Sequence, residues 1–170
     1  MKIGFIGLGV MGKSMVRNLI KNGFEVLIYA RNPKKVQDLV SDGLVLYDNI
    51  KDLVQEVDVV ITIVGFPRDV EEVYFDEDKI INNAKEKTIL IDMTTSSPSL
   101  ALSIYEKAKA KELYSLDCPV TGGDLGAKQG TLTIFVGGDQ EIFQKVKPVL
   151  EAMGKNIAYV GGPGTGQHAK

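Results

Sequence analysis

The sequence contains little of the chemistry that builds metal centres or hydrolase sites. Its 170 residues include one histidine, His168, and one cysteine, Cys118. Zinc sites use sets of Cys and His ligands, so we expect no metal site. A Ser-His-Asp triad is equally unexpected, because there is no G-x-S-x-G motif and no histidine to spare. The lone cysteine can form no internal disulfide, which is typical of a protein in the reducing cytoplasm.

The chain also lacks a strong charge of either sign and any long apolar run. Its formal net charge is −2, which argues against nucleic acid as a partner. No apolar stretch approaches the roughly 20 residues of a membrane span, so we expect no membrane partner. The length, with 44% hydrophobic and 25% charged residues, predicts one globular domain with a substantial core.

Segments of strand and helix character alternate along the chain. Apolar runs of strand length, such as 25–29 and 59–64, are separated by amphipathic stretches of helical period. This alternation predicts an α/β fold, a doubly wound and mostly parallel Rossmann-type sheet of about eight strands. We expect the first six strands to be parallel in the order 3-2-1-4-5-6. Residues 121–130 are expected to form a polar loop, and the orientation of the last two strands is left open.

The first residues carry the clearest motif. Gly7, Gly9 and Gly12 form G-x-G-x-x-G between a short apolar strand and an amphipathic helix. In a dinucleotide-binding turn these glycines allow the tight turn, the approach of a pyrophosphate, and close packing of helix on strand. The N–H groups of the first helical turn then attract phosphate. The alternative is a glycine-rich turn without a ligand. The residues predicted to bind the pyrophosphate are Gly7, Leu8, Gly9, Val10, Met11 and Gly12.

A basic residue replaces the acid that usually follows the second strand of an NAD-binding fold. The acid normally holds the ribose of NAD, about twenty residues beyond the glycines. Here Ala30 occupies that place, Arg31 follows, and Lys35 lies close by. An arginine can bind the 2′-phosphate of NADP through charge-assisted hydrogen bonds, whereas an acid would repel it. We therefore predict NADP, with NAD as the alternative; a solvated basic helix start would also explain the pattern.

Two further segments are expected at the carboxyl edge of the sheet, where such folds bind their ligands. Val64, Gly65 and Pro67 follow the fourth predicted strand, and the glycine would admit a cofactor ribose. Thr95 follows the fifth strand, where its hydroxyl could meet the nicotinamide amide. Both segments could instead be ordinary helix starts, because proline and hydroxyl residues are common there.

Four motifs, in chain order, resemble those of the β-hydroxyacid dehydrogenase family. They are G-F-I-G-L-G-V-M-G, D-M-T-T-S-S-P, D-C-P-V-T-G-G-D-L-G-A-K-Q-G-T-L and G-P-G-T-G-Q-H-A-K. The family includes 3-hydroxyisobutyrate dehydrogenase, tartronate semialdehyde reductase and 6-phosphogluconate dehydrogenase. The resemblance implies an NAD(P)-dependent enzyme that interconverts a small 3-hydroxy acid and its semialdehyde or ketone by hydride transfer. It also implies that the parent protein is a homo-oligomer.

The resemblance assigns roles to single residues. Thr121, Gly122 and Gly123 match the loop that binds the substrate carboxylate, with threonine where the family has serine. Lys170 matches the catalytic lysine, which exchanges a proton with the substrate oxygen. Thr95 matches the residue near the nicotinamide. The family's NADP-associated pattern is matched loosely by Arg31 and Asn32, while Ala30 departs from it.

The family pattern extends beyond these residues. Lys170 ends the chain, whereas the family's lysine lies on a long helix that leads into an all-helical domain. We therefore expect residues 1–165 to form the NAD(P)-binding domain and residues 166–170 to begin the interdomain helix of a truncated chain, with the helical domain absent. We expect the parent protein to be an enzyme. For the 170 residues alone, the alternative, a dinucleotide-binding module without turnover, describes the expected behaviour better.

Overall fold

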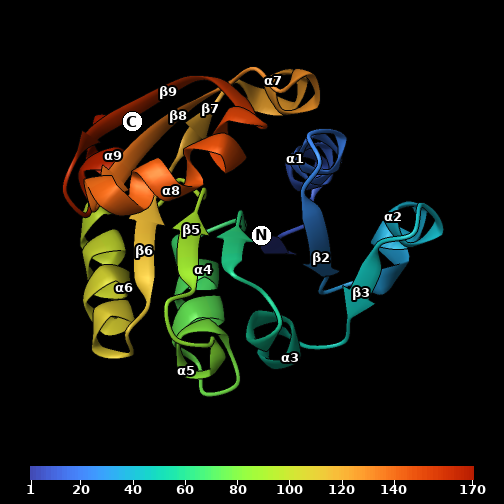
Figure 1. Ribbon diagram of the computed structural model, residues 1–170, viewed down its shortest axis with the longest axis horizontal. Coiled ribbons are helices and arrows are strands. Elements are labelled where there is room, and N and C mark those ends of the chain that lie inside the picture. The colour runs from blue at the N-terminus through green and yellow to red at the C-terminus, as the bar shows by residue number, and fades with distance from the viewer.

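Strands and helices alternate throughout the computed structural model, which describes residues 1–170 (Figure 1). One sheet contains all the strands: β1 (Lys2–Ile6), β2 (Glu25–Tyr29), β3 (Val45–Tyr47), β4 (Val59–Thr62), β5 (Ile89–Asp92), β6 (Tyr114–Asp117), β7 (Val120–Thr121), β8 (Leu132–Gly138) and β9 (Gly154–Gly161). The helices are α1 (Val10–Lys21), the 3₁₀ helix η1 (Pro33–Val36), α2 (Gln37–Ser41), α3 (Ile50–Gln55), α4 (Pro67–Phe75), α5 (Ile80–Asn83), α6 (Pro98–Ala110), α7 (Gly123–Gln129), α8 (Gln140–Glu151) and α9 (Thr165–Ala169).

The sheet confirms the predicted order of its first six strands. These strands are parallel and follow the order β3-β2-β1-β4-β5-β6. The sheet then changes direction, because β8 runs antiparallel to β6 and β9 runs parallel to β8. A two-residue strand, β7, adds a ninth strand that the sequence did not predict. Residues 121–130 also differ from the expected loop, since most of them form the helix α7.

The strand ends are level along the carboxyl edge of the parallel sheet. Ile6 pairs with Tyr29 on one side and with Thr62 on the other. Thr62 pairs with Asp92, which pairs with Asp117. The segments that follow these five strands therefore begin at one edge, where a doubly wound sheet binds its ligands.

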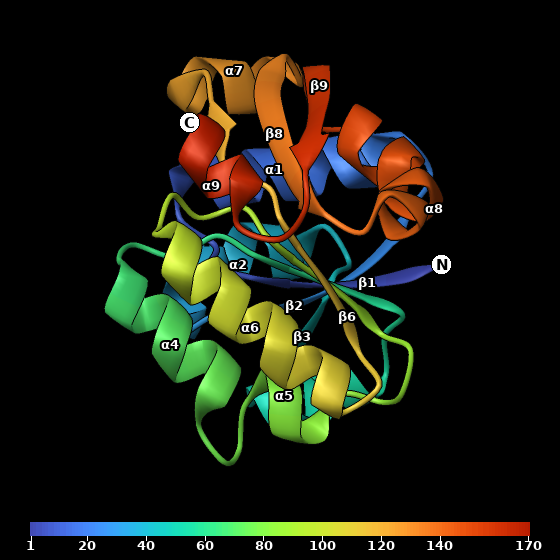
Figure 2. The same ribbon diagram turned by 90° about the vertical axis from the view of Figure 1, so that its left-hand side faces the viewer.

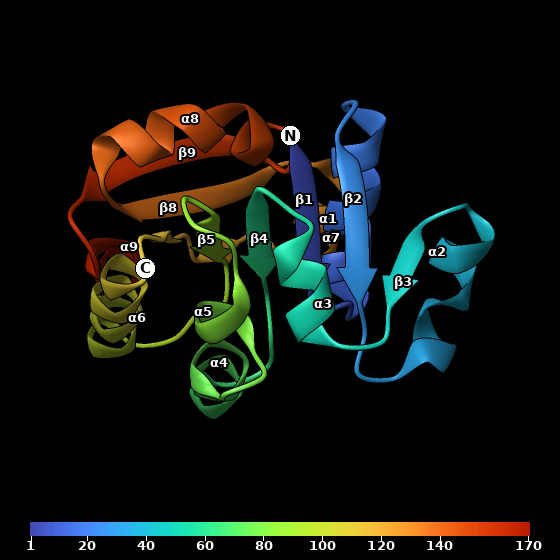
Figure 3. The same cartoon turned by 60° about the horizontal axis from the view of Figure 1, so that its bottom comes forward.

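Apolar side chains cover both faces of the sheet and divide the core in two. In β4, Val59 and Ile61 join one cluster and Val60 joins the other, because successive side chains of a strand point to opposite faces. The first cluster takes buried residues from α1, α7 and α8, and the second from α3, α4, α5 and α6. Figure 2 shows α4 and α6 side by side on the second face, and Figure 3 shows α8 along β8 and β9. Strands covered on both faces explain the continuous apolar runs of the sequence.

No helix in the structure combines the length and the apolar character that crossing a membrane requires. Nowhere do three or more His, Cys, Asp or Glu side chains gather in a way that could hold a metal ion.

Candidate functional site

The glycines of the first turn are fixed by backbone contacts on one side and open on the other. Gly7 has a φ of +105°, and a Cβ atom there would overlap the carbonyl oxygen of Ile63. A Cβ atom on Gly12 would overlap the carbonyl oxygen of Gly7, so α1 starts in direct contact with the turn. Gly9 differs, because a Cβ atom there would meet no atom within 4 Å. The space beside Gly9 is thus available to a ligand that contacts the backbone.

The amino end of α1 offers donors to such a ligand. Gly9 caps the helix in an extended conformation, without a side chain to satisfy the first N–H groups. The N–H groups of Val10, Met11 and Gly12 donate to no acceptor in the protein, while Lys13 N donates to Gly9 O at 3.0 Å. No acidic residue lies in this first turn. Free N–H groups at the positive end of a helix dipole form a site for an anion.

Arg31 lies just beyond the carboxyl end of β2, on the same edge as the glycine turn. Its side chain is 75% exposed, and the nearest carboxylate, that of Glu72 in α4, is 4.0 Å away. The side chain of Asn32 accepts a hydrogen bond from Lys34 N at 3.2 Å and caps η1. Lys35 is exposed and forms no ion pair. The guanidinium and the Lys35 ammonium are thus free to meet an anionic group beside β2.

The loops after β4 and β5 are joined at the same edge. Val64 N donates a hydrogen bond to Thr94 Oγ1 at 2.9 Å, and Thr94 N donates to a carboxylate oxygen of Asp92 at 3.2 Å. Gly65 and Pro67 remain exposed beside this junction. The hydroxyl of Thr94 therefore has a structural partner, whereas Thr95, the next residue, is exposed at the surface of the loop.

The last helix brings two residues of the predicted site together. Lys170 Nζ donates a hydrogen bond to Thr95 Oγ1, although the two residues are 75 positions apart. Both side chains are exposed. Lys170, to which the resemblance assigns proton exchange, thus contacts Thr95, which the resemblance places beside the nicotinamide.

The segment expected to bind a carboxylate spans the end of β7 and the start of α7. Thr121, Gly122 and Gly123 are exposed, and both glycines have positive φ angles, +136° and +63°. A Cβ atom on Gly123 would meet no atom within 4 Å. Figures 1 and 2 show α7 and the end of the chain in the same upper layer of the molecule. These three residues form no hydrogen bond to Lys170 or Thr95.

A family model described as the NAD binding domain of 6-phosphogluconate dehydrogenase matches residues 2–161. The chain belongs to this family. The oxidoreductase YkwC of Bacillus subtilis, whose activity is uncharacterized, is 55% identical over 99% of this chain and 58% of its own length. A 3-hydroxyisobutyrate dehydrogenase of Pseudomonas aeruginosa is 41% identical over 99% of the chain and 56% of its own length.

Solved structures show the same fold for this NAD-binding domain. The 3-hydroxyisobutyrate dehydrogenase of Mycobacterium tuberculosis, solved with L-serine, superposes with a TM-score of 0.93 at 34% identity. The match covers 99% of this chain and 57% of that one. The chain therefore spans little more than half the length of the relatives that it matches.

Two buried acidic residues, Asp117 and Asp92, hold the segments that carry the site, and neither was identified from the sequence. Asp117, at the end of β6, accepts hydrogen bonds from Gly164 N at 2.9 Å and from Gln167 N at 3.0 Å. Its carboxylate thus holds the start of α9, and burial raises the pKa of Asp117 although these bonds oppose the rise. The sequence feature that could have identified this role is an acidic residue at the end of a parallel strand, together with a glycine-rich loop that later brings the chain back to that strand.

Asp92, at the end of β5, holds the neighbouring loops. Its carboxylate accepts a hydrogen bond from Thr62 Oγ1 at 3.0 Å, and that hydroxyl is 2.6 Å from the Tyr74 hydroxyl. Complete burial raises the pKa of Asp92 to about 6, and the hydrogen bonds from Thr94 and Thr62 oppose the rise. Burial also raises the pKa of Tyr74 well above its ordinary value. Asp92 fixes the loop that carries Thr94 and Thr95. Asp92 and Thr94 are buried, whereas Thr95 is exposed to a ligand.

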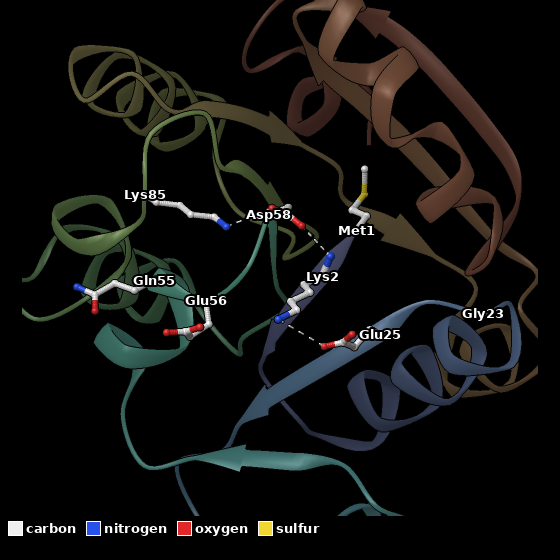
Figure 4. Close-up of a pocket in the computed structure, with 8 residues that line it drawn as sticks. All are labelled: Met1, Lys2, Gly23, Glu25, Gln55, Glu56, Asp58 and Lys85. Atoms are coloured by element: carbon white, nitrogen blue, oxygen red, sulfur yellow. Dashed lines mark hydrogen bonds and ion pairs between the residues drawn. The ribbon is translucent and has the colours of Figure 1, made fainter.

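A surface depression of about 640 Å³ lies at the opposite, amino edge of the sheet (Figure 4). Its centre is occupied by Asp58, whose carboxylate accepts from Lys2 N at 2.9 Å and pairs with Lys85 Nζ at 3.2 Å. Lys2 also pairs with Glu25, at 4.0 Å, and the depression is remote from the glycine turn. We assign it no part in the site of this NAD-binding domain.

Proposed function

We propose that the domain binds a nicotinamide dinucleotide along the carboxyl edge of its sheet and serves an oxidoreductase acting on a 3-hydroxy acid. The observation that carries this proposal is the contact of Lys170 with Thr95 at the edge where the glycine turn opens. The 3-hydroxyisobutyrate dehydrogenases among the relatives support the substrate class. So does an NAD-dependent L-serine dehydrogenase of Pseudomonas aeruginosa, which is 40% identical over 99% of the chain and is named for a 3-hydroxy acid.

The residues of the turn fit a pyrophosphate. The open space beside Gly9 admits the phosphates, and the N–H groups of Val10, Met11 and Gly12 donate to them. Val64, Gly65 and Pro67 would line the path of the dinucleotide toward Thr95. When bound, the dinucleotide supplies the hydride acceptor or donor of the reaction.

The proposed preference is for NADP. Arg31 and Lys35 would bind the 2′-phosphate, with Ala30 and Asn32 shaping the backbone around it. The exposed guanidinium has only a distant carboxylate beside it, which leaves its donors free. A solved structure that is 28% identical and has a TM-score of 0.93 contains NADP⁺. This supports the fit of the fold to the phosphorylated cofactor.

On the substrate side, Thr121 and the backbone around Gly122 and Gly123 would bind the carboxylate of the acid. Lys170 Nζ would give a proton to the substrate oxygen during reduction and take it back during oxidation. Thr95 Oγ1 would orient that amine. The known relatives are longer, so we propose residues 1–165 as the cofactor domain and 166–170 as the start of a helix that continues in a full-length protein. The buried thiol of Cys118 is compatible with the cytoplasmic location we propose.

The test combines a binding assay with a turnover assay. The chain is titrated with NADPH and with NADH by fluorescence, and the oxidation of 3-hydroxyisobutyrate and of L-serine is followed by absorbance in a full-length protein. We expect binding of both nucleotides, tighter for NADPH, and turnover that Lys170→Ala abolishes. Failure to bind either nucleotide would contradict the proposal. Binding by the chain without turnover by the full-length protein would instead indicate a dinucleotide-binding module. The exposure of Lys170, Thr121 and Gly123 is also compatible with such a module.

A further inference from the structure

Gln167 is a buried polar residue that the proposed function leaves without a role. It lies in α9, three residues before Lys170, and is only 7% exposed. A glutamine at such depth loses the hydrogen bonds of water and needs both halves of its amide satisfied by the protein. The hydrogen-bond partners of the Gln167 side chain therefore indicate its role.

Both partners of the side chain belong to the loop that carries Thr95. Gln167 Nε2 donates a hydrogen bond to Thr94 O at 2.7 Å, and Gln167 Oε1 accepts one from Ser96 N at 2.9 Å. The two bonds flank Thr95 on either side along the backbone. An amide matches this pair of partners, because one end donates and the other accepts.

The backbone of Gln167 is held from a different strand. Its N–H group donates to Asp117 Oδ2 at 3.0 Å, so Gln167 links the end of β6 to the loop after β5. Gly166, beside it, is packed so closely that a Cβ atom would lie 2.8 Å from the same carboxylate oxygen. The helix that carries Lys170 is thereby fixed against the loop that carries Thr95.

We propose that Gln167 is a positioning residue that sets the contact between Lys170 and Thr95. The side-chain amide fixes the loop relative to α9, and the hydrogen bond from Lys170 Nζ to Thr95 Oγ1 forms only when both are in place. The inference deepens the proposed function and rests on it for the role of Lys170.

The test measures the reactivity of one amine in the 170-residue chain. Lysines are labelled with trace acetic anhydride, and the rate at Lys170 is divided by the rate at Lys147, an exposed lysine in α8. Thr95→Val removes the acceptor and should raise this ratio about fivefold, the effect of about 1 kcal/mol. Gln167→Leu should raise it to the same extent. Gln144→Leu, the same substitution at an exposed position of α8, should leave it unchanged.

The double variant separates positioning from a general effect on stability. If Gln167 acts through Thr95, Thr95→Val/Gln167→Leu should give no higher ratio than Thr95→Val alone. A ratio that stays at the wild-type value in Gln167→Leu, or effects of the two substitutions that multiply, would overturn the inference. Circular dichroism confirms that each variant is folded.

Two measurements keep the test decisive if Gln167→Leu does not fold. Gln167→Glu retains the acceptor for Ser96 N and loses the donor to Thr94 O, so it should raise the ratio too. In the wild-type chain, the side-chain amide protons of Gln167 should exchange with water far more slowly than those of Gln144, measured by NMR; equal rates would overturn the inference. Titration of the same samples with NADPH shows separately whether the proposed function fails.

Discussion

Gly12 packs directly against the carbonyl group of Gly7, because a Cβ atom at position 12 would overlap that oxygen. The contact involves two backbone segments, the turn after β1 and the first turn of α1, and neither can move without disturbing the sheet. A ring carbon of Phe5 would also lie 3.2 Å from the place of that Cβ atom.

We therefore expect Gly12→Ala to lower the free energy of unfolding by about 1–3 kcal/mol, as overpacking does in a dense interior. Urea unfolding followed by circular dichroism measures the change. Gly162→Ala is the control, because a Cβ atom at position 162 meets no atom within 4 Å. Equal midpoints for both variants would show that the turn is not packed as described.

We expect Arg31 to determine the preference for NADPH over NADH. Arg31→Glu should weaken NADPH binding by about tenfold or more, the loss of at least one charge-assisted hydrogen bond, and leave NADH binding nearly unchanged. Fluorescence titration with both nucleotides gives the ratio. Lys21→Glu makes the same change of charge at an exposed end of α1 and should alter the ratio little. An unchanged ratio in Arg31→Glu would rule out the phosphate contact.

Glu72 faces the same guanidinium from α4, at 4.0 Å. A carboxylate there competes for Arg31 and repels a phosphate, so Glu72→Gln should tighten NADPH binding slightly, by about twofold to threefold. The gain should shrink as salt is added, because exposed charges are screened. A weaker affinity for NADPH in this variant would mean that Glu72 orients Arg31 for the phosphate.

The buried carboxyl group of Asp92 should make stability depend on pH. Its pKa in the folded state is about 6, above the ordinary value of 3.8, so the folded protein binds the proton more tightly than the unfolded chain. The free energy of unfolding should therefore rise as the pH falls from above 6 to below 4, by up to about 3 kcal/mol from this group. Asp92→Asn should lack this contribution.

The measurement is the difference in unfolding free energy between the wild type and Asp92→Asn, taken at several pH values from 4 to 7. Taking the difference cancels the titration of the other acids. Asp76→Asn, at an exposed position with no hydrogen bond from its side chain, serves as the control. A difference that does not vary with pH would contradict a raised pKa at Asp92.

The sequence predicted the order and direction of β1 to β6, but it left the orientation of the last two strands open and did not predict β7 or α7. Glycine spacing and alternating periodicity are local signals, and they predicted β1 to β6 in the correct order. α7 has no such signal, because its seven residues include two glycines and lack an apolar stripe. It is held by tertiary contacts: Ala127 is buried, and Asn18 Nδ2 in α1 donates to Ala127 O at 2.8 Å. Local propensity cannot anticipate contacts over 109 positions.

The same distinction applies to the site. The edge residues were predicted from motifs that lie next to strand ends, and the contact between Lys170 and Thr95 was not among those predictions. The supporting residues were not predicted. Asp117 and Gln167 are 50 positions apart, and their bond depends on how the chain returns to the sheet after β9.

The central claim is that the space beside Gly9 holds the phosphates of a dinucleotide, and filling it is the most direct test. Gly9→Ala places a methyl group where no protein atom lies within 4 Å, so its stability should match that of Gly162→Ala to within about 0.5 kcal/mol. Titration with NADPH should show binding to the wild type and to Gly162→Ala, and binding about tenfold weaker or worse to Gly9→Ala. Equal affinity in all three proteins, or no binding to the wild type, would contradict the account.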